Sequence, residues 1–193
     1  MTTLNLTLSL EKLVADIVGK VEEFSHIDPL RVMLCVSSTK GGGVHGVYAK
    51  IHPLRFAGGA RSMEVKRGRR SALLTMPSVI DRQNEMLYVI YFLVPRFFNL
   101  PKREKLVTVF HELYHISPRF DGDIRRFPGR NFAHGRSRKR YNALMDELVA
   151  AYLSLPGCSG VTDFLDGDLE SLRSRYRAVV GRRFPVPKAK VER

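Results

Sequence analysis

Apolar positions recur along the first third of the chain at two spacings, one typical of a helix and the other of strands. Residues 10–24 carry apolar side chains at helical spacing, so the pattern predicts an N-terminal helix with Thr7 or Ser9 as its cap. RVMLCVSS at 31–38 and VYAKIHPLRF at 47–56 have the composition or the alternation of strands. Because a glycine-rich stretch joins these two strands, the sequence predicts that they pair as a hairpin.

The middle of the chain predicts an exposed segment and then two more strands. The Gly- and Arg-rich sequence AGGARSMEVKRGRR at 57–70 is typical of an exposed loop, with a short strand around residues 63–66. SALLTMP at 71–77 predicts a short strand. MLYVIYFLVPRF at 86–97 is rich in aromatic and β-branched residues, which favours a strand that is buried on both faces until Pro95 ends its pairing.

Two helices are predicted in the second half of the chain. Pro101 favours a helix start, and the helical period continues to about residue 116. The apolar stripe of this helix comprises Leu106, Val109, Phe110, Leu113 and Ile116. A second helix is predicted over 138–155, and its core stripe comprises Tyr141, Leu144, Met145, Leu148, Tyr152 and Leu155. Together these elements predict an α+β fold built on a small twisted sheet.

The composition is that of one globular domain, with 44% hydrophobic and 26% charged residues in a chain of 193. We expect the domain to span residues 1–184 and the basic tail 185–193 to be frayed. The longest apolar run, 86–94, is far shorter than the roughly 20 residues of a membrane-spanning helix, so no membrane partner is expected. No secretory signal is recognisable, and Cys35 and Cys158 are too few for a disulfide framework. These features predict a cytoplasmic protein and indicate no oligomeric state.

Positive charge is concentrated in two regions of the chain. The formal net charge is +13 and the pI is near 10.1, an excess that favours polyanionic partners such as nucleic acid. One basic cluster lies between residues 119 and 140 and the other between 171 and 193. The candidate nucleic-acid contacts are Arg136, Arg138, Lys139 and Arg140. The alternative is a solvated basic surface without a partner.

The sequence FHELYHI at 110–116 contains the chemistry-bearing motif HELYH. At about 100° per residue, His111, Glu112 and His115 lie within about a quarter of the helix circumference, opposite the apolar stripe. The two histidines are one turn apart, so both imidazoles can reach one zinc ion, and Glu112 can accept a proton from a water bound to that ion. The motif therefore predicts a hydrolytic zinc site, whereas the alternative is a solvated helix face that carries two unconnected histidines.

A catalytic zinc site needs a third protein ligand and one open position. In a metzincin that ligand and a turn glycine would fall on Asp121 and Pro118, so this class fits poorly. The remaining candidates are His134, which follows His115 after 18 residues, and Glu147, which follows it after 31. Glu147 can also serve as a residue that orients a ligand histidine.

HELYH followed by His134 and Gly135 resembles the motif of SprT-like proteases, including the Spartan type, and of phage-type metallopeptidases. The resemblance covers roughly residues 86–135, although the spacer here is long and Arg-rich and no cysteine ribbon follows it. It implies a zincin-like fold with an active-site helix and a second packing helix. It also implies zinc ligands at His111, His115 and His134, with Glu112 as the general base. ELVAAYLSLP is similar to the helix that supplies a glutamate in gluzincins, so Glu147 stays the alternative ligand.

These features together predict a zinc-dependent metallopeptidase that hydrolyses peptide bonds in proteins or peptides, including nucleic-acid-associated proteins. An edge of the strand predicted at 86–97 would hold the substrate in an extended conformation beside the helix. The alternative function is a basic nucleic-acid-binding protein in which the zinc site is structural. The two functions differ in whether water or protein occupies the fourth coordination position.

Overall fold

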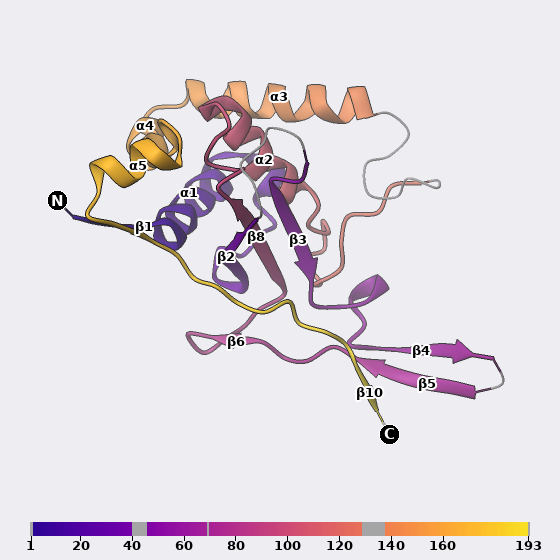
Figure 1. The fold of residues 1–193 in the computed structure, drawn as a ribbon. Helices are drawn as coiled ribbons and strands as arrows, with labels where there is room; N and C mark the ends of the chain where they lie inside the picture. Colours follow the sequence, from indigo (N-terminus) through magenta and orange to yellow (C-terminus); the bar gives the residue numbers. More distant parts are fainter. Residues whose placement is uncertain (1, 40–45, 69, 129–137, 193) are drawn as a thin grey trace.

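A three-stranded sheet in the order β2–β8–β3 forms the centre of the fold, in a computed structural model that describes residues 2–39, 46–68, 70–128 and 138–192 (Figure 1). β8 (Tyr88–Val94) runs parallel to β2 (Val32–Ser38) and antiparallel to β3 (Ala49–Pro53). The strands predicted at 31–38, 47–56 and 86–97 are therefore confirmed. The predicted hairpin is wrong, because the apolar strand β8 lies between β2 and β3 and pairs with both.

Three helices lie on one side of this sheet: α1 (Leu6–Lys20) and α2 (Lys102–Tyr114) contact its strands, and α3 (Arg138–Ser154) packs on α2 (Figure 1). α1 begins earlier than the apolar pattern predicts, because the side chain of Asn5 caps it by accepting a hydrogen bond from the Leu8 N–H at 3.1 Å. In α3 the buried stripe includes Val149, whereas Leu155 is 38% exposed beyond the helix end and is not part of the core. No helix in the described part of the chain is long and apolar enough to span a bilayer.

The C-terminal segment crosses the molecule and passes the β2 edge of the central sheet (Figure 1). The short helices α4 (Cys158–Thr162) and α5 (Leu169–Arg175) lead into β9 (Ala178–Val180), which pairs in parallel with β1 (Thr3–Asn5). The chain then passes β2, where the Val36 N–H donates to the Arg182 carbonyl at 2.8 Å. It ends in β10 (Lys190–Glu192). Residues 190–192 are therefore strand-paired and not frayed as the composition of the tail predicted.

A ribbon of two long strands projects from the body of the protein (Figure 1). β4 (Ser62–Arg67) pairs antiparallel with β5 (Arg70–Thr75), and β10 adds a third strand along the outer edge of β5. The short strand predicted around residues 63–66 is confirmed as β4, and the strand predicted at 71–77 is confirmed as β5. The exposed loop predicted over the rest of 57–70 is shorter than expected, because β4 extends to residues 62–67 through its pairing with β5. A smaller hairpin of β6 (Ile80–Asp81) and β7 (Asn84–Glu85) leads back into β8.

Candidate active site on helix α2

α2 places the HELYH motif against the central sheet. Leu106, Val109, Phe110 and Leu113 are at most 1% exposed and pack into the core, as the helical period predicts. The helix ends at Tyr114, and His115 closes its last turn with a backbone hydrogen bond to the His111 carbonyl at 3.3 Å. The helix therefore holds the motif in a rigid element whose orientation is set by the core.

The imidazoles of His111 and His115 converge on one point. Their Nε2 atoms are 3.0 Å apart, and their ring planes are inclined by 82°. Two nitrogens bound to one tetrahedral zinc at about 2.0–2.1 Å would lie about 3.3 Å apart. The donor set and its spacing therefore fit a metal ion held by both rings.

Tyr141 on α3 packs against both histidines. Its ring centroid lies 5.1 Å from that of His111 and 6.1 Å from that of His115. Its hydroxyl donates to the His111 carbonyl at 3.4 Å, and the residue is 5% exposed. The sequence places Tyr141 correctly in the buried stripe of α3, but only the packing of α3 on α2 brings it to the imidazoles.

Glu112 is buried beside the two histidines, with 6% of its surface exposed. Burial raises the pKa of its carboxyl to about 7, because the charged form loses hydration, while the backbone amide of Ile51 on β3 acts in the opposite sense. A carboxyl with a pKa near neutrality can exchange a proton with a reacting water at physiological pH.

A cavity of about 210 Å³ lies beside the motif. It is lined by the start of β3 and the preceding residues on one side, and by α2 on the other; the lining residues are Gly46, Val47, Tyr48, Ala49, Val107, Thr108, His111 and Glu112. The strand that borders this cavity is β3 and not β8. The edge predicted at 86–97 is therefore wrong for substrate binding, because both edges of β8 are already paired.

The loop after α2 is organised around Asp123, which sequence reasoning did not single out. Its carboxylate accepts two hydrogen bonds from Arg126 at 2.9 Å each, one from the Gly58 N–H at 2.9 Å and one from the Ile124 N–H at 2.8 Å. Burial alone would raise the pKa of this carboxyl, but the hydrogen bonds together lower it. The nearby Asp-Gly turn is a weak sequence signal for such a residue, because the partners at 58 and 126 are recognisable only after folding.

The structure brings together His111, Glu112 and His115 but none of the other predicted ligands. Glu147 is exposed on α3, on the opposite side from the buried stripe, and His134 lies outside the described residues. Asp121 forms an ion pair with Arg119 at 2.9 Å. Within the described residues, no third His, Cys, Asp or Glu joins the two histidines in a group that could hold a metal ion.

The predicted nucleic-acid contacts are only partly described. Arg136 lies outside the described residues, Arg138 begins α3, and Lys139 and Arg140 are exposed on its first turn.

Three other arginines of the spacer are engaged within the protein. Arg119 and Arg126 form ion pairs with Asp121 and Asp123. Arg125 pairs with Glu23 at 3.1 Å and lies over the Tyr114 ring at 3.9 Å. Arg125 is therefore held within the fold, whereas Arg119 and Arg126 form ion pairs at the surface.

A comparison with protein families places the chain in a family. A family model described as "Putative phage metallopeptidase" matches residues 6–148, a span that runs from the start of α1 into α3 and includes the whole HELYH motif. The chain belongs to this family. Membership in the phage metallopeptidase family implies a metal ion and a protein or peptide substrate. It confirms the resemblance to phage-type metallopeptidases, while the resemblance to SprT-like proteases stays a prediction. No curated protein and no solved structure matches the chain.

Proposed function

We propose that this phage metallopeptidase is a zinc-dependent endopeptidase whose general base is Glu112. The observation that carries the proposal is a buried carboxyl, with a pKa raised to about 7, beside two imidazoles whose Nε2 atoms converge. A purely structural zinc would need four protein ligands and would gain nothing from a buried carboxyl next to them. The burial of Glu112 therefore favours catalysis over the structural-zinc alternative.

His111, His115 and His134 are the proposed zinc ligands. The two imidazoles on α2 supply neutral nitrogen donors, which suit zinc better than the oxygen-preferring cations. For the third ligand we favour His134 over Glu147, because Glu147 faces away from the buried side of α3.

A bound zinc ion would act as a Lewis acid, lowering the pKa of a coordinated water and polarising the substrate carbonyl. Glu112 accepts the proton of the attacking water on its carboxylate and then delivers it to the nitrogen of the leaving amine. Because β3 and α2 exclude solvent from this carboxyl, the proton stays with the reacting groups.

The outer edge of β3, which pairs with no other strand among the described residues, is the proposed binding site for the substrate backbone. Tyr48 and Leu54 direct their backbone groups to β8, with hydrogen bonds of 2.8 and 2.9 Å. Alternate residues of an antiparallel strand face opposite ways, so Ala49 and Ile51 direct theirs away from β8. The Ile51 N–H is bonded to the Glu112 carboxyl, which leaves the backbone of Ala49 and the Ile51 carbonyl for a substrate. An extended peptide can add to this edge as a further strand and place a carbonyl beside Glu112.

Metal analysis of purified ligand variants tests the proposal. We expect the wild-type protein to bind close to one zinc per chain and to lose hydrolysis of an unfolded protein substrate when a chelator removes the metal. His134→Ala should lower the zinc content more than Glu147→Ala, which is the matched control. A larger loss of zinc in Glu147→Ala than in His134→Ala would show that Glu147 is the third ligand. Hydrolysis that survives complete metal removal would disprove the proposed function.

A further inference from the structure

A cavity of about 530 Å³ lies at the end of the central sheet where the parallel strands β2 and β8 finish. It is lined by Ser37 and Ser38 at the end of β2 and by Val94 and Pro95 at the end of β8. Small-molecule sites have volumes of about 300–1,000 Å³ and often lie at the carboxyl ends of parallel strands. The position and the size of this cavity are therefore those of a ligand site.

The other walls of the cavity belong to the C-terminal part of the chain. α5 contributes Leu169 and Arg173, which are four residues apart and therefore share a face of the helix. Residues 179–181 and Arg183 contribute the segment that passes β2, drawn in yellow in Figure 1. The cavity thus exists only when this segment lies against the sheet.

Specific contacts fix the C-terminal segment beside the cavity. The Val36 N–H donates to the Arg182 carbonyl at 2.8 Å, and the Arg182 N–H donates to the Thr7 hydroxyl at 2.7 Å. A Cβ atom at Gly181 would lie 2.7 Å from the Val36 side chain, so the backbone approaches β2 closely only because this residue is glycine. The wall of the cavity is therefore a defined surface.

The charge in the cavity is positive. Its charged lining residues are Arg173 and Arg183, and no Asp or Glu is among the described residues that line it. Both arginines are exposed, and neither forms an ion pair within the described part of the chain. Two guanidinium groups without a carboxylate create a positive potential in the cavity, which attracts an anion.

A second cavity on the same C-terminal segment shows the contrast. It has a volume of about 400 Å³, and its lining includes Glu11, Arg82 and Arg182. Glu11 pairs with Arg82 at 3.3 Å and with Arg182 at 3.7 Å, and Asp81 pairs with Arg182 at 2.8 Å. Arg182 is therefore neutralised by the protein, whereas its neighbour Arg183 lines the cavity that has no acidic residue.

We propose that the cavity at the ends of β2 and β8 binds a small phosphate ester. A phosphate monoester carries a charge of about −1.5 to −2 at neutral pH, which the guanidinium groups of Arg173 and Arg183 would neutralise together. Guanidinium groups bind phosphate oxygens with two parallel hydrogen bonds, and the hydroxyls of Ser37 and Ser38 are further donors. A carboxylate carries a single charge and would neutralise only one of the two arginines.

The apolar part of the lining would hold the organic part of the ester. Its residues are Leu6, Val36, Val94, Pro95, Leu169 and Val179. Contact with an apolar group removes the surface of these side chains from water, which favours binding. Inorganic phosphate would leave this surface uncovered and should therefore bind more weakly than an ester.

The site is separate from the candidate active site. Among the described residues, the cavity shares no lining residue with the one beside the HELYH motif. Binding of a phosphate ester therefore does not depend on the proposed peptidase activity, and the two proposals can fail independently.

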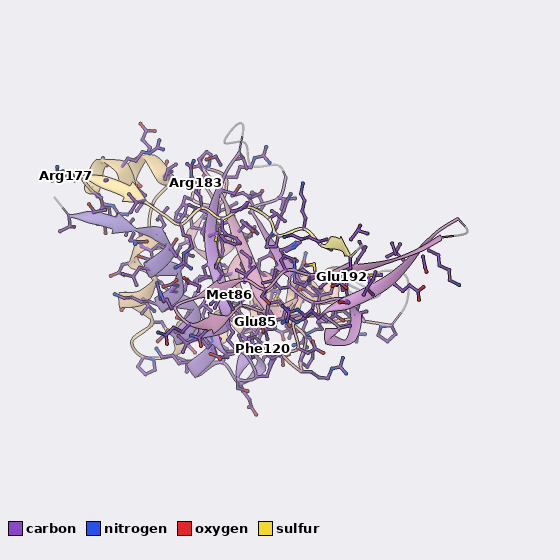
Figure 2. All side chains as sticks on the ribbon, turned by 90° about the horizontal axis from the view of Figure 1, so that it is seen from below. Glu85, Met86, Phe120, Arg177, Arg183 and Glu192 are labelled. Carbon is purple, nitrogen blue, oxygen red and sulfur yellow. The ribbon has the colours of Figure 1, made fainter. Side chains whose placement is uncertain are left out.

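The test is an isothermal titration of the full chain with phenyl phosphate, benzoate and inorganic phosphate. The cavity variant is Arg173→Gln/Arg183→Gln, and each single substitution is measured as well. The matched control is Arg177→Gln/Lys188→Gln, which removes the same charge from two exposed residues outside the cavity lining. Figure 2 labels Arg177 at the end of the molecule and Arg183 further along the C-terminal segment.

Phenyl phosphate should bind the wild type more tightly than benzoate or inorganic phosphate does. Its affinity should fall by about 10-fold in the cavity variant, because each exposed cation contributes up to about a factor of five, and should fall less in each single variant. The control should bind as the wild type does. Both substituted side chains are exposed, so the fold should be retained, and circular dichroism checks this.

Four results would overturn the proposal. The first is that the wild type does not bind phenyl phosphate, and the second is that benzoate or inorganic phosphate binds as tightly. The third is an equal loss of affinity in the cavity variant and the control, which would indicate net charge alone. The fourth is unchanged affinity in the cavity variant, which would place the ligand elsewhere, for example at a metal ion in the active site.

Discussion

The α2 site and the β4–β5 ribbon use charged residues in opposite ways. At the site, Glu112 and His115 are at most 8% exposed, and the aromatic ring of Tyr141 packs against the imidazoles. At the ribbon, Lys66 is exposed and Arg67 opposes Arg70 across the strand pair. Burial raises the pKa of a single carboxyl at the site, whereas the described charge of the ribbon is in contact with solvent. The first arrangement suits chemistry on one bond, and the second does not.

Asp123 links these two regions. It follows the active-site helix in the chain and accepts a hydrogen bond from Gly58, which directly precedes the ribbon. The Arg125 N–H, two residues later, donates to the His115 carbonyl at 2.6 Å. One buried carboxylate therefore connects the loop after α2 to the segment that leads into the ribbon.

The largest expected effect concerns the buried carboxyl of the site. Glu112→Gln keeps the side-chain shape but removes the proton acceptor, so peptide hydrolysis should fall by roughly 10²–10⁴-fold. Zinc content and thermal unfolding should stay close to wild type. Glu147→Gln, with the same chemical change on the exposed face of α3, should retain hydrolysis. Comparable activity in the Glu112→Gln variant and the wild type would place the base elsewhere.

The second effect concerns the residue between the two regions. Asp123→Asn removes the charge that Arg126 and two backbone N–H groups satisfy, so the free energy of unfolding at neutral pH should fall by about 2–3 kcal/mol. Asp146→Asn is the control, because its ion pair with Arg103 is about half exposed and should contribute at most about 0.5 kcal/mol. Denaturant titration measures both losses.

The difference in stability between the wild type and Asp123→Asn should depend on pH. The folded pKa of Asp123 is lowered from 3.8, so its stabilising contribution is complete above that value and is lost as the pH falls through the lower, folded value. The stability difference between wild type and Asp123→Asn should therefore shrink below about pH 3.8. A difference that grows in acid would contradict the hydrogen-bonded carboxylate.

Local pattern was sufficient for the elements that carry the site. The helical period places α2 within two residues of its bounds and separates its core stripe from the HELYH motif, because residues three and four apart share a face in any α-helix. The run of apolar residues at 86–97 likewise identifies β8 as a strand buried on both faces. These features depend on neighbours in the sequence, so the sequence of one chain was enough to predict membership in a metallopeptidase family.

Tertiary structure alone decided how these elements meet. The pairing of β8 with both β2 and β3, the capture of residues 190–192 by β5, and the contact of Tyr141 with the two histidines all join segments far apart in the chain. So does the junction of Gly58, Asp123 and Arg126, which no spacing rule predicts. Strand edges and buried polar groups can be satisfied by any partner of suitable chemistry. Which strand or polar group becomes the partner is decided only when the whole core packs. The sequence of one segment therefore cannot predict it.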